Sequence, residues 1–118
     1  MTLQDELIQL SRELGREDRH LAILGEGNTS ADCSDGTFLV KSSGTSLATL
    51  EPTGLSRVSH AKVDEILARP HVSEQEIEEG LVACLADPAH KKPSVETFLH
   101  SLCLRQPGVA WVGHTHTV

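Results

Sequence analysis

The sequence predicts an α/β sandwich built around a mostly antiparallel sheet. An amphipathic N-terminal stretch is followed by strand and hairpin signals, whereas helical patterns dominate from about residue 60 to residue 105. A last apolar run, residues 109–113, then returns the chain as a strand. Strands gathered early and helices gathered later suggest one sheet with helices packed on it.

A helix and a hairpin come first. Leucines recur at helical spacing between residues 3 and 14, which predicts an amphipathic helix over about residues 3–18. Residues 21–24 then run into a glycine-containing loop at residues 25–28. Two short runs, residues 29–33 and 37–41, flank Asp35-Gly36, a turn signal typical of a β-hairpin.

The second half of the chain is expected to be mainly helical. Residues 55–59 predict a short strand, and residues 60–69 a helix that Pro70 ends. Ser73 and Glu76 form a capping-box pattern, which predicts a helix through about Ala86. Ser94 is expected to N-cap a further helix through about Arg105. The final strand is apolar on both faces up to its histidines, as in an interior strand.

Composition limits the possible functions. A length of 118 residues predicts a single domain, 1–118. With 10 Lys+Arg against 17 Asp+Glu, the formal charge is −7, which argues against a nucleic-acid partner. No apolar run is long enough to cross a bilayer, so no membrane association is expected.

The cysteines point to a reducing compartment. Cys33, Cys84 and Cys103 are odd in number and widely spaced, and they form no CxxC motif. This pattern fits neither a disulfide framework nor a zinc ribbon. We therefore expect three reduced thiols and a cytoplasmic protein, because the N-terminus also lacks the pattern of a signal peptide.

His114 and His116 form the clearest candidate metal site. Side chains of a strand alternate between its faces, so these two imidazoles are expected on the same side, about 7 Å apart along the backbone. Two such imidazoles can bind one Zn²⁺-class ion. Taken alone, the pair fits two half-exposed strand histidines equally well. A catalytic zinc normally has three protein ligands, and the third is not evident.

Glu96 and His100 lie four residues apart on the predicted helix that precedes the last strand, hence on one helix face. The short connection folds this helix back antiparallel to the strand, which brings the helix start opposite His114 and His116. A carboxylate beside a metal suits proton abstraction next to a carbonyl or hydroxyl. Taken alone, Glu96 is better explained as a first-turn acid and His100 as a packed histidine.

Two polar loops suggest an anion site. Residues 27–30 and 42–46 are rich in glycine, hydroxyl and amide groups, and such loops can bind phosphate through backbone N–H groups. Each loop alone is more often a simple turn. Gly25 and Gly27 lack the third glycine of a dinucleotide fingerprint and the lysine of a P-loop.

Taken together, these motifs resemble the class II aldolase/adducin-type family, which includes fuculose-phosphate and rhamnulose-phosphate aldolases. The resemblance covers the whole chain and rests on four motifs in the same order: Gly27-Asn28-Thr29-Ser30, Ser43-Gly44-Thr45, Pro93-Ser94-Val95-Glu96 with His100, and His114-Thr115-His116. It implies a three-layer α/β/α sandwich with a mixed, mostly antiparallel sheet. The chain is similar to about the first half of a typical member, so an apparently truncated domain is expected.

The resemblance also implies a function and its residues. It implies Zn²⁺, or another divalent metal, on His114 and His116, and Glu96 as the catalytic acid/base. The substrate phosphate would lie at Gly27, Asn28, Ser43, Gly44 and Ser94. The implied reaction is retro-aldol cleavage of a sugar phosphate through a metal-stabilised enediolate, and the implied assembly is a homotetramer.

Alternatives remain open at this stage. The same family includes epimerases and dehydratases that act on sugar phosphates, and adducin-like scaffolds without catalysis. Family members place a third histidine ligand beyond the sequence matched here, so the remaining ligand could be His100 or a group from a neighbouring chain.

Overall fold

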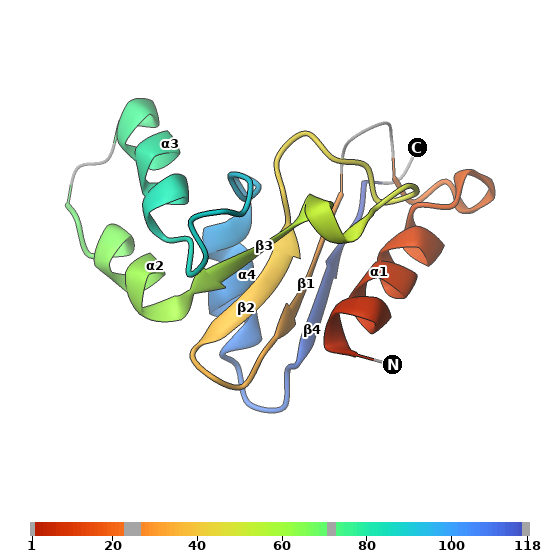
Figure 1. The fold of residues 1–118 in the computed structure, drawn as a ribbon, viewed down its shortest axis with the longest axis horizontal. Coiled ribbons are helices and arrows are strands. Elements are labelled where there is room, and N and C mark those ends of the chain that lie inside the picture. Colours follow the sequence, from red (N-terminus) through yellow and green to blue (C-terminus); the bar gives the residue numbers. More distant parts are fainter. Residues whose placement is uncertain (1, 23–26, 71–72, 117–118) are drawn as a thin grey trace.

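The computed structural model describes residues 2–22, 27–70 and 73–116. Within these ranges, four strands form one sheet with helices on both of its faces (Figure 1). The strands are β1 (Asn28–Asp32), β2 (Thr37–Lys41), β3 (Leu55–Ser59) and β4 (Trp111–His114). The α-helices are α1 (Leu3–Leu14), α2 (His60–Leu67), α3 (Glu74–Ala83) and α4 (Thr97–Leu104), and short 3-10 helices span Glu17–Arg19 and Pro52–Gly54.

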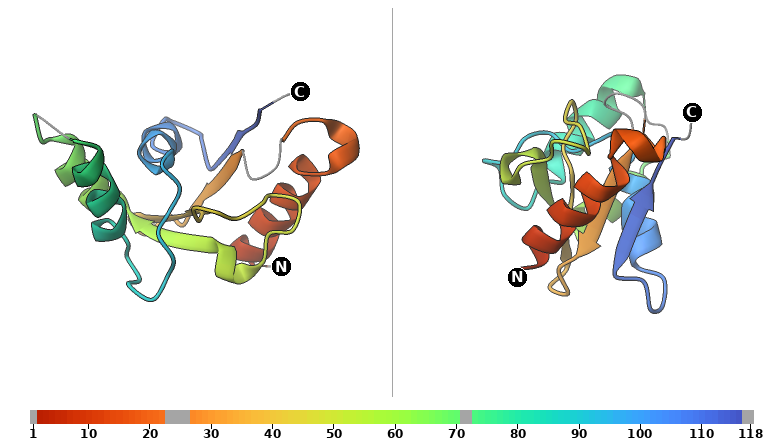
Figure 2. Two further views of the ribbon diagram at one scale, coloured as in Figure 1. Left: turned by 90° about the horizontal axis from the view of Figure 1, so that it is seen from above. Right: turned by 90° about the vertical axis from the view of Figure 1, so that its right-hand side faces the viewer.

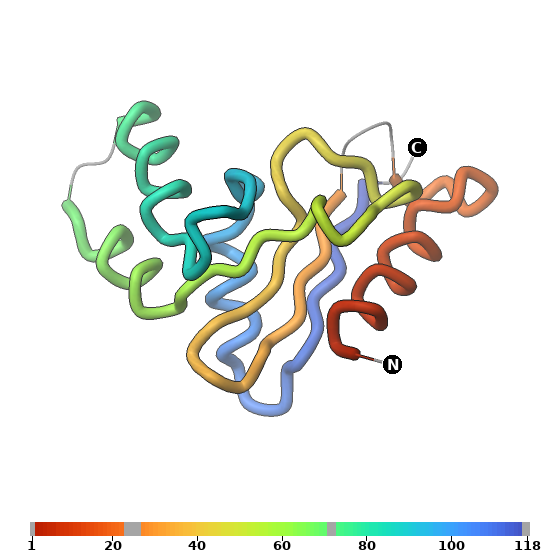
Figure 3. Tube along the Cα trace, in the orientation of Figure 1, coloured from red at the N-terminus to blue at the C-terminus, as the bar shows by residue number. Residues whose placement is uncertain are grey.

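The sheet has the order β3-β2-β1-β4, and each of these pairings is antiparallel. The predicted hairpin is confirmed, since β1 and β2 pair directly. Strand β1 lies between β2 and β4, and its first residue, Asn28, is opposite His114. The start of β1 and the end of β4 therefore meet at one end of the sheet, as the tube in Figure 3 also shows.

Two apolar cores, one on each face of the sheet, give the three layers. Helix α1 covers one face and α4 the other, which is clear when the molecule is seen from above (Figure 2). The core beneath α1 comprises Leu7, Ile8, Ala31, Leu39, Leu50 and Leu55. The core on the opposite face comprises Phe38, Val40, Val58, Val63, Cys84, Leu85 and Leu104. The α/β/α sandwich predicted from the sequence is confirmed.

Several boundaries differ from the prediction. Helix α1 ends at Leu14 instead of continuing to residue 18, because Gly15 follows as its C-cap and packs closely against Leu47 and Ala48. A Cβ at Gly15 would lie 2.4 Å from the Ala48 nitrogen, so this position excludes a side chain. Helices α2 and α3 also end two to three residues early, at Leu67 and Ala83, which is a common uncertainty at helix ends.

The prediction that Ser94 N-caps the last helix is wrong. Helix α4 begins at Thr97, and Glu96 occupies the N-cap position without a side-chain capping bond. Ser94 Oγ instead accepts a hydrogen bond from the Glu96 amide at 3.1 Å, and Thr97 Oγ1 donates to the Ser94 carbonyl at 2.6 Å. The segment before α4 is thus a hydroxyl-stabilised turn, which leaves the Glu96 carboxylate free of any capping role.

The prediction that the final strand lies inside the sheet is also wrong. Among the described residues β4 pairs with β1 alone, so it is an edge strand, and Trp111 is 37% exposed. Gly113 of β4 is closely approached by α1, since a Cβ there would lie 3.1 Å from Leu14 Cδ1. The missing side chain thus lets α1 pack close to the sheet.

No helix in the described ranges is long and apolar enough to cross a membrane. All three cysteines are free thiols, with Cys84 buried and Cys33 and Cys103 partly exposed.

Candidate functional site

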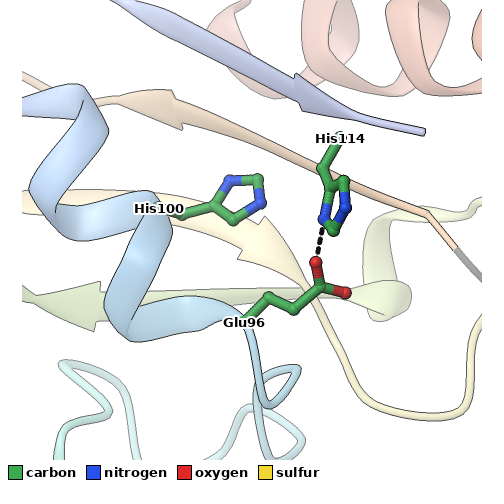
Figure 4. A group of neighbouring side chains, drawn as sticks. All are labelled: Glu96, His100 and His114. Atoms are coloured by element: carbon green, nitrogen blue, oxygen red, sulfur yellow. Dashed lines mark ion pairs between the residues drawn. The ribbon is translucent and has the colours of Figure 1, made fainter. Parts of the chain in front are cut away.

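Glu96, His100 and His114 converge where α4 begins and β4 ends (Figure 4). One donor atom from each of the three side chains lies within 4.8 Å of the others. Glu96 immediately precedes α4, His100 is one turn into that helix, and His114 is the last residue of β4. We refer to these three residues as the acid–imidazole cluster.

Glu96 and His114 contact each other directly. Glu96 Oε2 forms an ion pair with His114 Nδ1, and both side chains are partly exposed. Helix α4 and strand β4 are joined by a short connection, so they run side by side and bring the two residues together. This proximity agrees with the expectation that the helix start lies opposite the end of the last strand.

His100 is the buried member of the cluster. Its side chain is 1% exposed, and its Nδ1 lies 2.6 Å from Ser30 Oγ on β1. Burial lowers the pKa of His100 to about 4, so the imidazole is neutral near pH 7. A neutral imidazole offers one nitrogen lone pair, which is the form in which histidine binds metals.

The cluster contains buried polar atoms that lack hydrogen bonds. Within the described ranges, His100 Nε2 and Asn28 Oδ1 have no polar partner, whereas Glu96 Oε2 and His114 Nδ1 contact each other alone. Leaving a buried polar atom unsatisfied costs about 1–3 kcal/mol, so such atoms gathered at one point favour a ligand there. One carboxylate oxygen and two imidazole nitrogens form a donor set that suits Zn²⁺ or a similar divalent ion.

His116 lies beside the cluster. Its ring centroid is 4.7 Å from that of His114, with an angle of 38° between the ring planes. The two imidazoles of the predicted pair are therefore neighbours, as expected. His116 follows the end of β4 and lines the adjacent cavity, and the three donors within 4.8 Å of one another are those of Glu96, His100 and His114.

A cavity of about 320 Å³ adjoins the cluster. Its walls combine the predicted acid/base, Glu96, and one predicted metal ligand, His116, with residues of both polar loops. The lining residues are Gly27, Lys41, Ser43, Gly44, Ser94, Val95, Glu96 and His116. Four of the five residues predicted to bind phosphate thus share one cavity with Glu96.

Asn28, the fifth predicted residue, lies behind this wall. Its Nδ2 donates to Ser94 Oγ at 2.6 Å, and the Asn28 side chain is fully buried. The Ser94 amide in turn donates to the Lys41 carbonyl at 3.2 Å. Asn28 therefore fixes the Ser94 hydroxyl and joins β1 to the segment that precedes α4.

Two glycines give the cavity its backbone shape. Gly27 and Gly44 have φ values of +96° and +79°, a region that favours glycine. A Cβ at Gly27 would lie 2.8 Å from Leu47 Cδ1 and 3.3 Å from the His114 carbonyl oxygen. The Gly44 position is open among the described atoms, so its requirement for glycine is conformational.

Lys41 is a cavity residue that the sequence prediction missed. It ends β2, is only 3% exposed, and donates from Nζ to the Thr45 carbonyl at 2.6 Å. Burial lowers the pKa of Lys41. A lysine that directly follows an apolar strand and precedes a hydroxyl-rich loop was the available signal, because lysine is rarely buried without a reason.

A comparison with known families identifies the domain. The family model described as the Class II Aldolase and Adducin N-terminal domain matches residues 5–118. This chain belongs to that family. The resemblance inferred from the four sequence motifs is therefore confirmed.

Solved structures show the same fold. The N-terminal class II aldolase domain of a conserved protein from Thermoplasma acidophilum is 28% identical, with a TM-score of 0.79 over 98% of this chain and 55% of that chain. YgbL from Escherichia coli, a candidate aldolase, epimerase or decarboxylase, is 23% identical with a TM-score of 0.68. The match covers 98% of this chain and 44% of YgbL, and at this identity it supports the fold alone.

A much longer relative also contains this domain. YuxG of Bacillus subtilis strain 168, an uncharacterized oxidoreductase, is 30% identical over 120 residues. That match spans 95% of this chain but 17% of YuxG. The class II aldolase/adducin domain described here therefore corresponds to a minor part of that relative and to about half of the matched structures.

Proposed function

We propose that this chain carries the acid/base, metal-binding and phosphate-binding part of a divalent-metal-dependent lyase that acts on a sugar phosphate. The observation that carries the proposal is the shared cavity, in which Glu96 and His116 face the same space as Lys41, Ser43 and Gly44. Family membership supports an aldolase-type reaction.

The metal would be held by His114 and His116, as the family resemblance implies, and Glu96 lies beside His114. A bound Zn²⁺-class ion supplies Lewis acidity, which stabilises negative charge developing on a substrate oxygen. The convergence of three donor atoms, one of them the unpartnered His100 Nε2, supports an ion at this position.

Glu96 would accept and return the proton. Its carboxylate lines the cavity and makes no capping bond to α4, so it can reach a substrate there. A carboxylate within reach of a hydroxyl or an activated C–H is a suitable general acid/base.

The phosphate would be bound at the cavity wall formed by the two polar loops and Ser94. Ser43 and Ser94 supply hydroxyl groups, Gly27 and Gly44 allow close approach of the backbone, and Lys41 adds a positive charge. Backbone N–H groups in such glycine-containing turns are effective phosphate ligands. Lys41 is buried in this wall, where the lower dielectric strengthens its attraction for an anion.

Related reactions start from the same site. An epimerase or dehydratase would use the same base and phosphate contacts, and YgbL is a candidate for aldolase, epimerase or decarboxylase activity. The oxidoreductase name of YuxG applies to a protein of which this domain covers 17%. We favour the lyase because the matching family model is that of class II aldolases and adducins, and Glu96, His114 and His116, which the resemblance implies for catalysis and metal binding, are present.

The proposal is tested with the 118-residue chain and a set of ketose 1-phosphates with Zn²⁺ present. Proton and phosphorus NMR would follow both binding and product release. We expect binding of the phosphorylated sugars, weaker binding of the same sugars without phosphate, and release of an aldehyde. Equal binding of both sugar forms, with no zinc uptake, would overturn the proposal and favour a non-catalytic scaffold. The expected homotetramer would be measured alongside by light scattering.

A further inference from the structure

Strand β1 presents three alternate polar side chains toward α4. Asn28, Ser30 and Asp32 occupy one face of the strand, and each is bonded to a group in α2, in α4 or just before α4. A sheet face beneath a helix is normally apolar, so three polar contacts in a row are unusual. The contacts of Ser30 and Asp32 both involve a buried histidine.

His60 is fully hydrogen-bonded within this network. Its Nδ1 lies 2.7 Å from Ser101 Oγ and its Nε2 lies 2.9 Å from Asp32 Oδ1, while the ring stacks on Phe38. Both nitrogens therefore have partners, as expected of a structural histidine. The Ser101 hydroxyl is completely buried, which excludes a nucleophilic role despite the resemblance to a serine–histidine–aspartate arrangement.

His100 differs from His60 in one respect. Its Nδ1 is bonded to Ser30 Oγ, but its Nε2 has no hydrogen-bond partner among the described residues and is buried. The ring directs this nitrogen toward Glu96 and His114 (Figure 4). A buried imidazole with one satisfied and one unsatisfied nitrogen is the arrangement of a metal-binding histidine without its metal.

The distances agree with such a role. Zn²⁺ binds nitrogen and oxygen ligands at about 2.1 Å, so two ligand atoms of one ion lie at most about 4.2 Å apart. The three donor atoms of the cluster all lie within 4.8 Å of one another, so small side-chain rotations suffice to bind one ion. Glu96 is the N-cap residue of α4, His100 lies within α4, and His114 ends β4, so the packing of α4 on the sheet holds all three in place.

We propose that His100 is a ligand of the divalent metal and that Ser30 is the residue that orients it. The inference rests on the proposed metal-dependent function and adds a ligand that the predicted His114/His116 pair does not include. A three-donor site of Glu96, His100 and His114 then forms within this chain.

Ser30 acts through the other nitrogen of the ring. When His100 Nδ1 donates its proton to Ser30 Oγ, the lone pair resides on Nε2, which faces the cluster. Metal-binding histidines are commonly fixed in this way by a partner of the second nitrogen, and loss of that partner typically weakens metal binding about 10- to 100-fold. Ser30 is fully buried in β1 and therefore rigidly placed.

The test is Zn²⁺ titration of the 118-residue chain by calorimetry, with histidine ¹⁵N NMR as a second measurement. Zn²⁺ is expected to shift the His100 Nε2 resonance in the wild type. Ser30→Ala is expected to weaken Zn²⁺ binding about 10- to 100-fold, and His100→Ala to weaken it further. Ser30→Ala also keeps the test valid should the cavity left by His100→Ala prevent folding.

Ser101→Ala is the matched control. Ser101 is also a fully buried serine bonded to a histidine Nδ1, but its partner His60 is outside the cluster. The proposal is supported if both serine variants lose stability but only Ser30→Ala binds Zn²⁺ more weakly. Wild-type affinity in His100→Ala and Ser30→Ala, with loss of binding in His114→Ala, would overturn the role of His100 but keep the metal site. Absence of Zn²⁺ binding by the wild type would overturn both.

Discussion

Asn28 and His114 lie directly opposite each other on β1 and β4. This pairing links the cavity wall that is proposed to bind phosphate to the acid–imidazole cluster. Asn28 bonds to Ser94, and His114 pairs with Glu96. Ser94 and Glu96 are only two residues apart in the turn that precedes α4. Two neighbouring strands thus hold both ends of one short turn. The distance between Ser94 and Glu96 in the site is therefore set by the register of β1 and β4.

Glu96→Gln is predicted to remove turnover while the fold remains intact. The amide keeps the size of the side chain but cannot accept the substrate proton, and general acid–base catalysis typically contributes about 10²- to 10⁴-fold in rate. The rate would be measured with whichever ketose phosphate the wild type cleaves. An unchanged melting temperature shows that the fold is retained, and a wild-type rate in Glu96→Gln would exclude this residue as the acid/base.

Local patterns predicted much of this site from the sequence. Period-two alternation placed His114 and His116 together, and helical spacing placed Glu96 and His100 on one face. The hairpin and the helix–strand connection then implied their approach. The order of strand and helix patterns predicted an α/β sandwich, and the family resemblance implied its three layers.

Other parts depend on tertiary contacts that spacing cannot report. Strand β4 ends at His114, so strand alternation no longer fixes where His116 points, and His100 joins the cluster in its place. The role of Ser30 follows from a contact across 70 residues of sequence. In the sequence, Lys41 is simply a polar residue at the end of a strand. Its burial in the cavity wall depends on the packing of its neighbours, which the sequence does not show.

Lys41→Met is predicted to weaken binding of phosphorylated sugars about tenfold or more, because a hydrogen bond to a charged group contributes roughly 1.5–3 kcal/mol. Binding of the same sugars without phosphate should change little. Lys91→Met is the control, since Lys91 is exposed and does not line the cavity. Equal losses for both variants would indicate a general effect of surface charge, and equal losses for both forms of the sugar would argue against a phosphate contact.

Cys84 is predicted to resist alkylation in the folded protein. Burial raises the pKa of its thiol to about 11, so the reactive thiolate is scarce at pH 8, and the side chain is also inaccessible. Cys33 and Cys103 are partly exposed and should react first with iodoacetamide. Mass spectrometry of the native and the urea-unfolded protein would show two and three modified cysteines, respectively. Rapid labelling of Cys84 at pH 8 without denaturant would contradict its buried position.

Gly44→Ala is predicted to lower both stability and ligand binding, whereas Gly36→Ala should lower stability alone. Both glycines have positive φ, +79° and +89°, and a Cβ at either meets no described heavy atom within 4 Å. The cost is therefore conformational, about 1–2 kcal/mol for a residue forced into the left-handed region. Gly36 lies in the β1–β2 turn, away from the cavity that Gly44 lines.

Urea denaturation would measure the two losses of stability, which should be similar. Titration with a ketose phosphate then separates the variants, because an altered backbone at Gly44 displaces the N–H groups of the anion-binding turn. Wild-type affinity in Gly44→Ala would show that this turn does not contact the phosphate. A loss of affinity shared by Gly36→Ala would show instead that reduced stability alone accounts for the effect.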